Sequence, residues 1–304
     1  MQAPDAFNPP VGVAEVVAPG VRRVLCGNPS AFTYRGTNTY IVGTGQVAVI
    51  DPGPEDAAHL SAILTALAPE ERITQILVTH AHRDHSPLAR ALAAETGAPV
   101  LAYGDASAGQ SEVMRRLAAS GDMGGGEGAD SEFAPDILLA DGDTVTGDGW
   151  RMTAVWTPGH FGNHLSFDMN GTVFCGDLVM GWASSLVSPP DGDLTDFMQS
   201  CAKLRDRAPR LFLPGHGAPV TDPVARIDWL IGHRRTREAA ILTALGAGPA
   251  DAAGLARTIY TDVPAAMLPA ATRNVLAHLI DLMGKSRVTP EGDLSAGTVF
   301  RLAG

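Results

Sequence analysis

The sequence predicts a layered α/β or α+β domain, followed by a small helical domain at the C-terminal end. Over the first two hundred residues, short β-branched segments alternate with turns and helical stretches, whereas helical segments dominate after residue 222. Such an alternation is typical of a sheet that is covered by helices. The sequence contains no internal repeat. We therefore expect one domain over residues 1–221 and a second over 222–304.

The elements of the first domain follow from the spacing of apolar residues. Apolar side chains three and four positions apart predict helices, and β-branched runs between Gly or Pro residues predict strands. In chain order, we expect strands at 39–42, 46–50, 75–79 and 99–102, with helices at 55–67 and 86–96. After a weaker stretch, we expect strands at 136–139, 151–156, 164–168, 172–175 and 210–213, with a helix at 194–204.

A glycine-rich segment, GDMGGGEG at 121–128, interrupts this pattern. Its composition predicts a flexible loop. Either the loop is a tolerated surface insertion, or it is a mobile rim over an active site.

The last eighty residues have the element order of a winged-helix module. We expect helices at 222–242, 251–260 and 264–283, and then a small hairpin at 287–289 and 298–300. Between residues 251 and 285 the only basic side chains are Arg257, Arg273 and Lys285, too few for a helix that reads DNA. We therefore expect this module to pack on the core and wall the mouth of the active site, or to form a homodimer contact.

Composition narrows the function classes. The 304 residues carry a net charge of -11, which argues against wholesale binding of nucleic acid while allowing a local basic patch. No run of about 18 apolar residues could span a membrane, and the first residues lack the features of a signal peptide. Three scattered cysteines cannot form a disulfide framework, so we expect a cytoplasmic protein.

The strongest motif is THAHRDH at 79–85, directly after a predicted buried strand. It places four potential metal ligands, His80, His82, Asp84 and His85, within six residues. So dense a polar cluster would leave buried groups unpaired unless a metal or water satisfied them. Imidazole and carboxylate are ligands of zinc, and also of manganese or iron. The motif therefore predicts a metal site.

Three further motifs also follow predicted strands. The sequence TPGH presents His160, the sequence CGD presents Asp177, and PGHG presents His216 between two glycines. Each motif is weak alone, but their common position at strand ends supports a shared site. A fourth, IDPG, carries Asp51, which taken alone is typical of an ordinary turn.

With these motifs, the sequence resembles the metallo-β-lactamase fold, a superfamily of binuclear metallohydrolases built as an αββα sandwich. The resemblance implies that His80, His82 and His160 hold one metal ion. It implies that Asp84, His85 and His216 hold a second, and that Asp177 bridges the two ions. Asp51 would then orient a ligand from behind. His82, where one branch of the superfamily has glutamate, favours a hydrolytic zinc site over a di-iron redox site.

Over nearly its full length the chain resembles more narrowly the β-lactamase-like protein 2 branch. The segments RGTNTY at 35–40, HFGNH at 160–164 and HRRTRE at 233–238 carry this resemblance, together with the C-terminal module. That branch includes an endoribonuclease acting on single-stranded RNA. Phe161 departs from the threonine that is frequent there, which we expect to alter the pocket wall. Cys175, two residues before Asp177, is interpreted as a buried strand residue.

The resulting expectation is a hydrolase of esters, thioesters or lactones that uses two divalent cations, Zn²⁺ before Mn²⁺ or Fe. Hydroxide would attack the substrate, with Asp84 or Asp177 accepting the proton. We expect His164 either to contact the substrate or leaving group, or to be a structural residue. His59 and His278 are expected to be surface or packing residues. The alternative is a ribonuclease acting on single-stranded RNA, which the arginines at 234, 235 and 237 favour.

Overall fold

The computed structural model of the chain describes residues 7–121, 128–261 and 263–304. Within these ranges, the larger sheet follows the order β1-β2-β3-β4-β5-β6-β7. Its strands are Ala14–Ala18, Val21–Leu25, Asn38–Val42, Gln46–Ile50, Arg72–Leu77, Val100–Ala102 and Ile137–Leu138. Pairing is antiparallel from β1 to β4 and parallel from β4 to β7.

A second sheet faces the first and has the order β12-β11-β10-β9-β8. Its strands, in that order, are Leu211–Pro214, Thr172–Gly176, Leu165–Met169, Trp150–Trp156 and Thr144–Gly147. Only β11 and β12 run parallel, so their C-terminal ends lie at the same edge. This edge carries two of the predicted site motifs.

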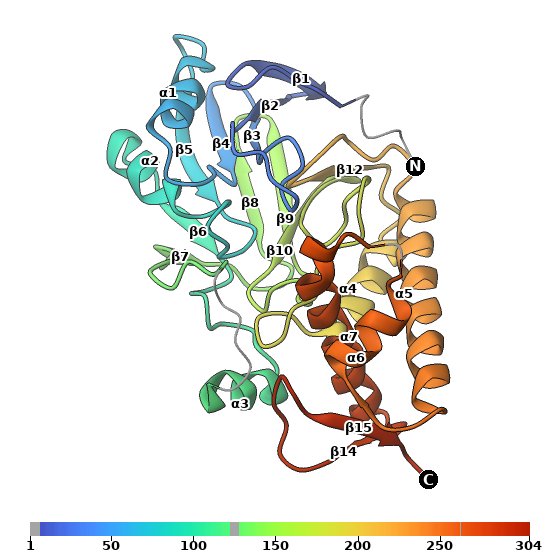
Figure 1. Cartoon of the computed structure of the whole chain (residues 1–304). Coiled ribbons are helices and arrows are strands. Elements are labelled where there is room, and N and C mark those ends of the chain that lie inside the picture. Colours follow the sequence, from blue (N-terminus) through green and yellow to red (C-terminus); the bar gives the residue numbers. More distant parts are fainter. Residues whose placement is uncertain (1–6, 122–127, 262) are drawn as a thin grey trace.

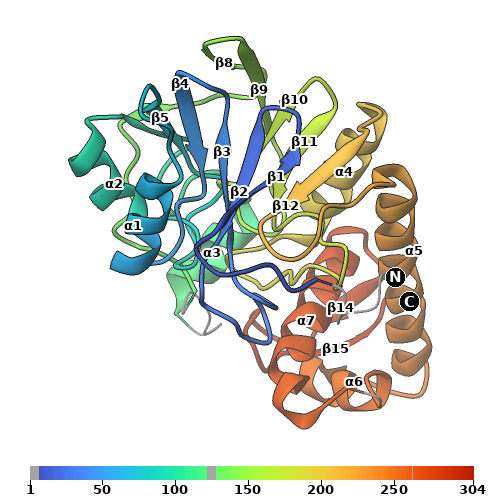
Figure 2. The same cartoon turned by 90° about the horizontal axis from the view of Figure 1, so that it is seen from above.

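Helices cover the outer faces of both sheets (Figures 1 and 2). Helices α1 (Ala57–Thr65) and α2 (Leu88–Thr96) pack on the larger sheet, and α4 (Leu194–Asp206) packs on the smaller one with the first half of α5 (Pro223–Leu245). Strand β4 shows why two cores form. Ala48 and Ile50 point into the core between the sheets, whereas Val47 and Val49 point toward the helices. The predicted αββα sandwich is confirmed.

The C-terminal part contains α6 (Ala252–Ile259), a 3₁₀ turn (Ala265–Met267) and α7 (Leu268–Gly284). A three-stranded sheet joins them, with the order β13 (Ala250–Asp251), β15 (Val299–Leu302) and β14 (Val288–Pro290). Its apolar core includes residues of α5 and of α3 (Glu112–Ser120) from the first domain. The expectation that this module packs on the core is therefore right, whereas the homodimer contact and the boundary at residue 222 stay predictions.

Several elements differ from the sequence-based expectation. Strands β1, β2 and β8 and helix α3 were not expected. In β2, Arg22 and Arg23 interrupt the apolar pattern by which a strand is recognised in the sequence. The strand accommodates them because each arginine forms an ion pair with a glutamate. Helix α3 buries only Met114 and Leu117 fully, and most of its other residues are exposed. Most of the expected loop at 121–128 lies outside the described residues. No helix in the described part of the chain is long and apolar enough to cross a bilayer.

Candidate metal centre

The candidate site lies where strands from both sheets end. His80, His82, Asp84 and His85 follow β5, Asp177 follows β11, and His216 follows β12. His160 comes from the turn between β9 and β10. Because β5 runs parallel to its neighbours and β11 runs parallel to β12, these ends converge at one edge of the sandwich. The structure thus brings together all seven residues that were expected to bind metal.

The ligand atoms form two neighbouring clusters. In the first, Nδ1 of His82 lies 2.8 Å from Nε2 of His80 and 3.1 Å from Nε2 of His160. In the second, Nε2 of His216 lies 3.1 Å from Asp84 Oδ2 and 3.3 Å from Nε2 of His85. Each set of three lies within 4.8 Å, the span expected of ligands to one ion.

Asp177 lies between the two clusters. Its Oδ2 is 3.7 Å from Nε2 of His160 and 3.2 Å from Nε2 of His216, while its Oδ1 is 3.6 Å from Nε2 of His85. Oδ1 is buried and has no hydrogen-bond partner among the described residues. A buried carboxylate oxygen without a donor is costly, and a cation would satisfy it.

The outward-facing ring nitrogens fix the tautomers of four histidines. Nδ1 of His160 donates to the Leu186 carbonyl at 2.7 Å, and Nδ1 of His216 donates to the Gly36 carbonyl at 3.1 Å. Nδ1 of His85 lies 2.9 Å from the Asp51 carboxylate. Such outer partners leave Nε2 as the bare nitrogen that can bind a metal ion.

The tautomer of His80 is fixed in the same way, through Thr79. The Thr79 hydroxyl donates to Asp51 Oδ2 at 2.7 Å, so it can only accept from Nδ1 of His80, which lies 2.9 Å away. Asp51 also accepts the Thr79 amide at 2.7 Å. Asp51 therefore orients His85 directly and His80 through Thr79, which is the supporting role expected of it.

The donor set fits divalent cations. Nε2 of His80 and Nε2 of His160, both without a hydrogen in the tautomers described above, face the same nitrogen of His82 at 2.8 and 3.1 Å, and a shared cation would satisfy all three. Burial, followed by the neighbouring imidazoles, lowers the pKa of His80 and of His82, the latter to about 3, which keeps both rings neutral. In the second cluster, the carboxylates overcome burial and raise the pKa of His216 to about 9. A cation bound there would take the place of that proton.

Gly215 shows how closely the backbone approaches this site. A Cβ atom at this position would lie 2.4 Å from Asp177 Oδ1 and 2.6 Å from Cε1 of His85, far inside van der Waals contact. The glycine before His216 is therefore required for the close approach that the PGHG motif predicted.

His164 lies behind the ligands instead of beside the substrate. It is fully buried, its Nδ1 lies 2.9 Å from the Thr157 hydroxyl, and its ring packs 5.2 Å from that of His80. It does not line the cavity in front of the site. The structure therefore gives no support to its expected contact with substrate or leaving group and favours the structural alternative.

Burial bears on three other expectations. Phe161 is fully buried, packs edge-on against His82, and is not among the residues that line the cavity, so it is not itself part of the pocket wall. Cys175 is a buried residue of β11 whose thiol donates to the Val179 carbonyl, as expected. His59 and His278 are both buried packing residues.

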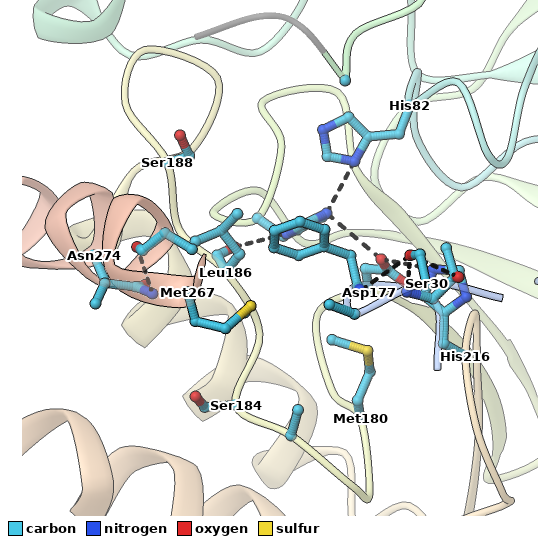
Figure 3. A pocket seen from close by; sticks show the side chains of 18 of the residues that line it. Ser30, His82, Asp177, Met180, Ser184, Leu186, Ser188, His216, Met267 and Asn274 are labelled. Atoms are coloured by element: carbon cyan, nitrogen blue, oxygen red, sulfur yellow. Dashed lines mark hydrogen bonds and ion pairs between the residues drawn. The ribbon is translucent and has the colours of Figure 1, made fainter. Parts of the chain in front are cut away.

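The site opens into a cavity of about 630 Å³ (Figure 3). His82, Asp84, His160, Asp177 and His216 form its floor. Its walls are largely apolar and include Phe32, Met180, Trp182, Leu186, Val263 and Met267. No Lys or Arg is among the described lining residues, and the undescribed segments contain none in their sequence. Val263 and Met267 belong to the C-terminal module, which therefore forms part of the cavity wall, as expected.

The sequence analysis missed the segment that follows Asp177. Residues 180–188 form one wall of the cavity and supply the Leu186 carbonyl to His160. A backbone carbonyl leaves no signal in the residue type, so no motif could have identified it. The aromatic ring of Trp182, stacked on Tyr34 at 5.0 Å, was the one feature that could have drawn attention to this wall.

Comparisons with known proteins agree with this site. The sequence model of the Metallo-beta-lactamase superfamily matches residues 33–216, and that of the Beta-lactamase associated winged helix domain matches residues 252–297. A Beta-lactamase-like protein 2 homolog from Drosophila melanogaster is 32% identical, covering 90% of this chain and 91% of its own. An Atrochrysone carboxyl ACP thioesterase from Aspergillus fumigatus is 30% identical, covering 78% of this chain and 68% of its own.

A solved structure supports the same assignment. A metallo-beta-lactamase family protein from Thermus thermophilus superposes with a TM-score of 0.75 at 25% identity, covering 94% of this chain and 100% of that chain. The coverage includes both the sandwich and the C-terminal module. The chain therefore belongs to the metallo-beta-lactamase superfamily of hydrolases and carries the winged helix domain associated with it.

Proposed function

We propose that this protein is a binuclear metallohydrolase that cleaves an ester, thioester or lactone bond of a largely apolar acyl substrate. The observation that carries the proposal is the cavity of about 630 Å³, whose floor is the His/Asp cluster and whose described walls are mostly apolar and free of basic side chains. Apolar walls hold an acyl group, whereas a phosphodiester substrate would call for cationic contacts.

The residues divide into holding and reacting groups. His80, His82 and His160 would hold one divalent cation, and Asp84, His85 and His216 a second, with Asp177 between them; zinc is the first candidate. Such ions would supply Lewis acidity toward a carbonyl and would make water more acidic. The ligand set alone does not distinguish zinc from manganese or iron.

Asp84 is the residue best placed to hold and deprotonate the attacking water. Its side chain is 29% exposed at the cavity floor, whereas that of Asp177 is 8% exposed. Although burial opposes it, the charge of His85 and the hydrogen bond from His216 hold the pKa of Asp84 below its ordinary value. The carboxylate is therefore ionised at neutral pH. Because a lowered pKa makes it a weaker base, its assignment as proton acceptor rests on its position at the cavity floor.

The thioesterase named among the relatives supports a thioester as the first substrate to test. The ribonuclease alternative rested partly on the arginine-rich stretch at 234–237. Arg234 is 2% exposed and points into the protein, so it offers no contact to a phosphate backbone. Arg235 is exposed and Arg237 is half-buried, but neither is among the described lining residues of the cavity. We therefore treat RNA cleavage as an outcome of the test. The cytoplasmic location expected from the cysteines is part of the proposal.

A substrate panel on zinc-loaded and manganese-loaded protein tests the function. It should place acyl thioesters, esters and lactones of two to twelve carbons beside single-stranded RNA and bis-p-nitrophenyl phosphate. We expect cleavage of a thioester, ester or lactone and no cleavage of RNA, with His82→Ala inactive. Cleavage of RNA without cleavage of any acyl substrate would overturn the proposal.

A further inference from the structure

The segment that connects Asp177 to α4 is hydrogen-bonded to helices α5 and α7 at several points between residues 180 and 187. Arg226 of α5 donates to the carbonyls of Met180 at 2.7 Å and Ala183 at 2.6 Å. Further along, Arg234 of α5 donates to the Ser185 carbonyl, and Asn274 of α7 accepts from the Val187 amide at 3.1 Å. The C-terminal helices thus hold the backbone that forms one wall of the cavity.

Leu186, at the centre of this segment, is hydrogen-bonded to His160, one of the candidate metal ligands. The Leu186 carbonyl, between the two held residues, accepts the hydrogen bond from Nδ1 of His160 at 2.7 Å. Ser185 and Val187 are fully buried, so neither backbone group can exchange its partner for water. In Figure 3, Asn274 and Leu186 lie on the same side of the cavity, opposite His216. The position of this carbonyl is therefore set from the C-terminal module.

Arg234 and Asn274 are hydrogen-bonded to each other as well as to the segment. Nη1 of Arg234 donates to Oδ1 of Asn274 at 3.0 Å, so this oxygen accepts from both the arginine and the Val187 amide. The guanidinium forks between a side chain and a backbone carbonyl, a geometry that the single ammonium of lysine cannot reproduce. Its carbon also lies 5.0 Å from the ring centre of Phe197.

Phe197 connects the same arginine to the other side of His160. A Cβ atom at Gly159 would lie 2.3 Å from Cα of Phe197, so α4 packs directly against the turn that presents His160. Arg234 therefore supports both the turn that presents His160 and the carbonyl that orients its ring.

We propose that Arg234 and Asn274 are positioning residues that set the orientation of His160 through the Leu186 carbonyl. The proposal rests on the metal site described above and gives α5, through Arg234, and the winged-helix domain, through Asn274, a role in metal binding. It predicts that loss of either side chain weakens metal binding before it affects the fold, because outer partners of a ligand histidine typically change metal affinity by about 10- to 100-fold.

The test uses metal binding as its readout. Metal-free wild type and the variants Arg234→Lys, Asn274→Ala and Asn274→Asp are titrated with Co²⁺, while visible absorption and competition with a chelator are measured. We expect Arg234→Lys and Asn274→Ala to bind the ion of the His160 cluster about 10- to 100-fold more weakly and to alter its absorption band. Asn274→Asp keeps an acceptor for both donors and should retain most of the affinity.

Leu230→Ala is the matched control for general destabilisation. Leu230 is fully buried one turn before Arg234 and packs in the apolar cluster that contains Phe197. As an apolar side chain, it makes no hydrogen bond to the segment at 180–188. This variant should melt at a lower temperature and keep the wild-type Co²⁺ spectrum. If Arg234→Lys fails to fold, the two Asn274 variants decide alone.

Two results would overturn the proposal in distinguishable ways. Wild-type Co²⁺ affinity and spectrum in folded Asn274→Ala would show that Asn274 does not position His160, while the metal site would stand. A wild-type protein that binds no Co²⁺ would overturn the metal site itself and the proposed function with it.

Discussion

Asp84 and Asp177 have the same chemistry but different surroundings. Both carboxylates lie beside His216 and line the cavity, yet the side chain of Asp84 is 29% exposed and that of Asp177 only 8%. From this difference we expect Asp84 to contact substrate and water, and Asp177 mainly to hold the two clusters together.

Replacing Asp84 with Asn tests this division. The substitution keeps the size of the side chain and removes its charge, so we expect kcat for acyl hydrolysis to fall by about 100- to 10,000-fold, the usual contribution of a general base. Metal content should fall as well, because a ligand is weakened. Ser188→Ala, also in the cavity wall, is the control and should remain active. Near-wild-type kcat in Asp84→Asn would remove this carboxylate from the mechanism.

His278 offers a separate test through stability. It is 1% exposed in α7, and neither ring nitrogen has a hydrogen-bond partner among the described residues. Burial, followed by the charges of Arg234 and Lys285, lowers the pKa of this imidazole to about 3. Between pH 6.5 and about 3 the unfolded chain binds a proton at His278 that the folded chain does not. Stability is therefore lost as the pH falls through this window.

We expect His278→Leu to raise the free energy of unfolding by about 1–3 kcal/mol, since it removes an unpartnered buried polar group. The gain should be larger at pH 5 than at pH 8. Denaturant unfolding at both values measures it. His278→Gln, which keeps polar atoms at the site but cannot titrate, should bring no gain at pH 8 and only the pH-dependent part of the gain at pH 5. Equal stability of His278→Leu and wild type at both pH values would contradict this interpretation.

At the scale of elements, α7 contributes directly to the cavity through Ala270, Ala271 and Asn274. Ala270→Phe would place a ring where we expect the acyl chain. KM for an eight-carbon thioester should rise by about 10-fold or more, with little change for an acetyl thioester, because the longer chain needs the filled space. Ala266→Phe, on the exposed side of the 3₁₀ turn, is the matched control. An unchanged preference for chain length would show that acyl groups bind elsewhere.

Predictability from sequence also differs among the elements. The strands that carry ligands are short, apolar and bounded by Gly or Pro, so THAHRDH, CGD and PGHG could be placed at strand ends from the sequence. HFGNH illustrates the limit, because His160 and His164 are four residues apart and only the three-dimensional turn separates the ligand from the buried residue. The wall at 180–188 depends on contacts with Arg226, Arg234 and Asn274, which are distant in the sequence, and no local pattern records them.

At the scale of the whole molecule, the charge of -11 and the cavity without basic side chains among its described lining residues point in the same direction. We expect KM for an acyl substrate to change by less than about twofold between 50 and 200 mM salt, because no phosphate contacts are involved. A protein with 6–10 phosphate contacts would lose about 1,000- to 100,000-fold in affinity over this range. Steady-state kinetics at the two ionic strengths measure the difference. A steep loss for the favoured substrate would point to an anionic, phosphate-bearing ligand.

The whole-molecule architecture was largely predictable, because alternation of apolar residues and the order of elements determine the layers. The use of the C-terminal module was predictable only in outline. Its helices were expected to wall the active site, and the described cavity includes them, but the hydrogen bonds from α5 and α7 to the segment behind His160 arise from tertiary contacts. These hydrogen bonds join the two parts of the chain beside the candidate metal centre.

The most direct test of the central claim is a titration of metal-free protein with Zn²⁺ while hydrolysis of an acyl thioester is followed. The account predicts that metal-free protein is folded and inactive, and that activity rises to a plateau near two ions per chain. In the same titration, His82→Ala should stay inactive. Full activity of the metal-free protein, or hydrolysis that does not depend on added metal, would contradict the account.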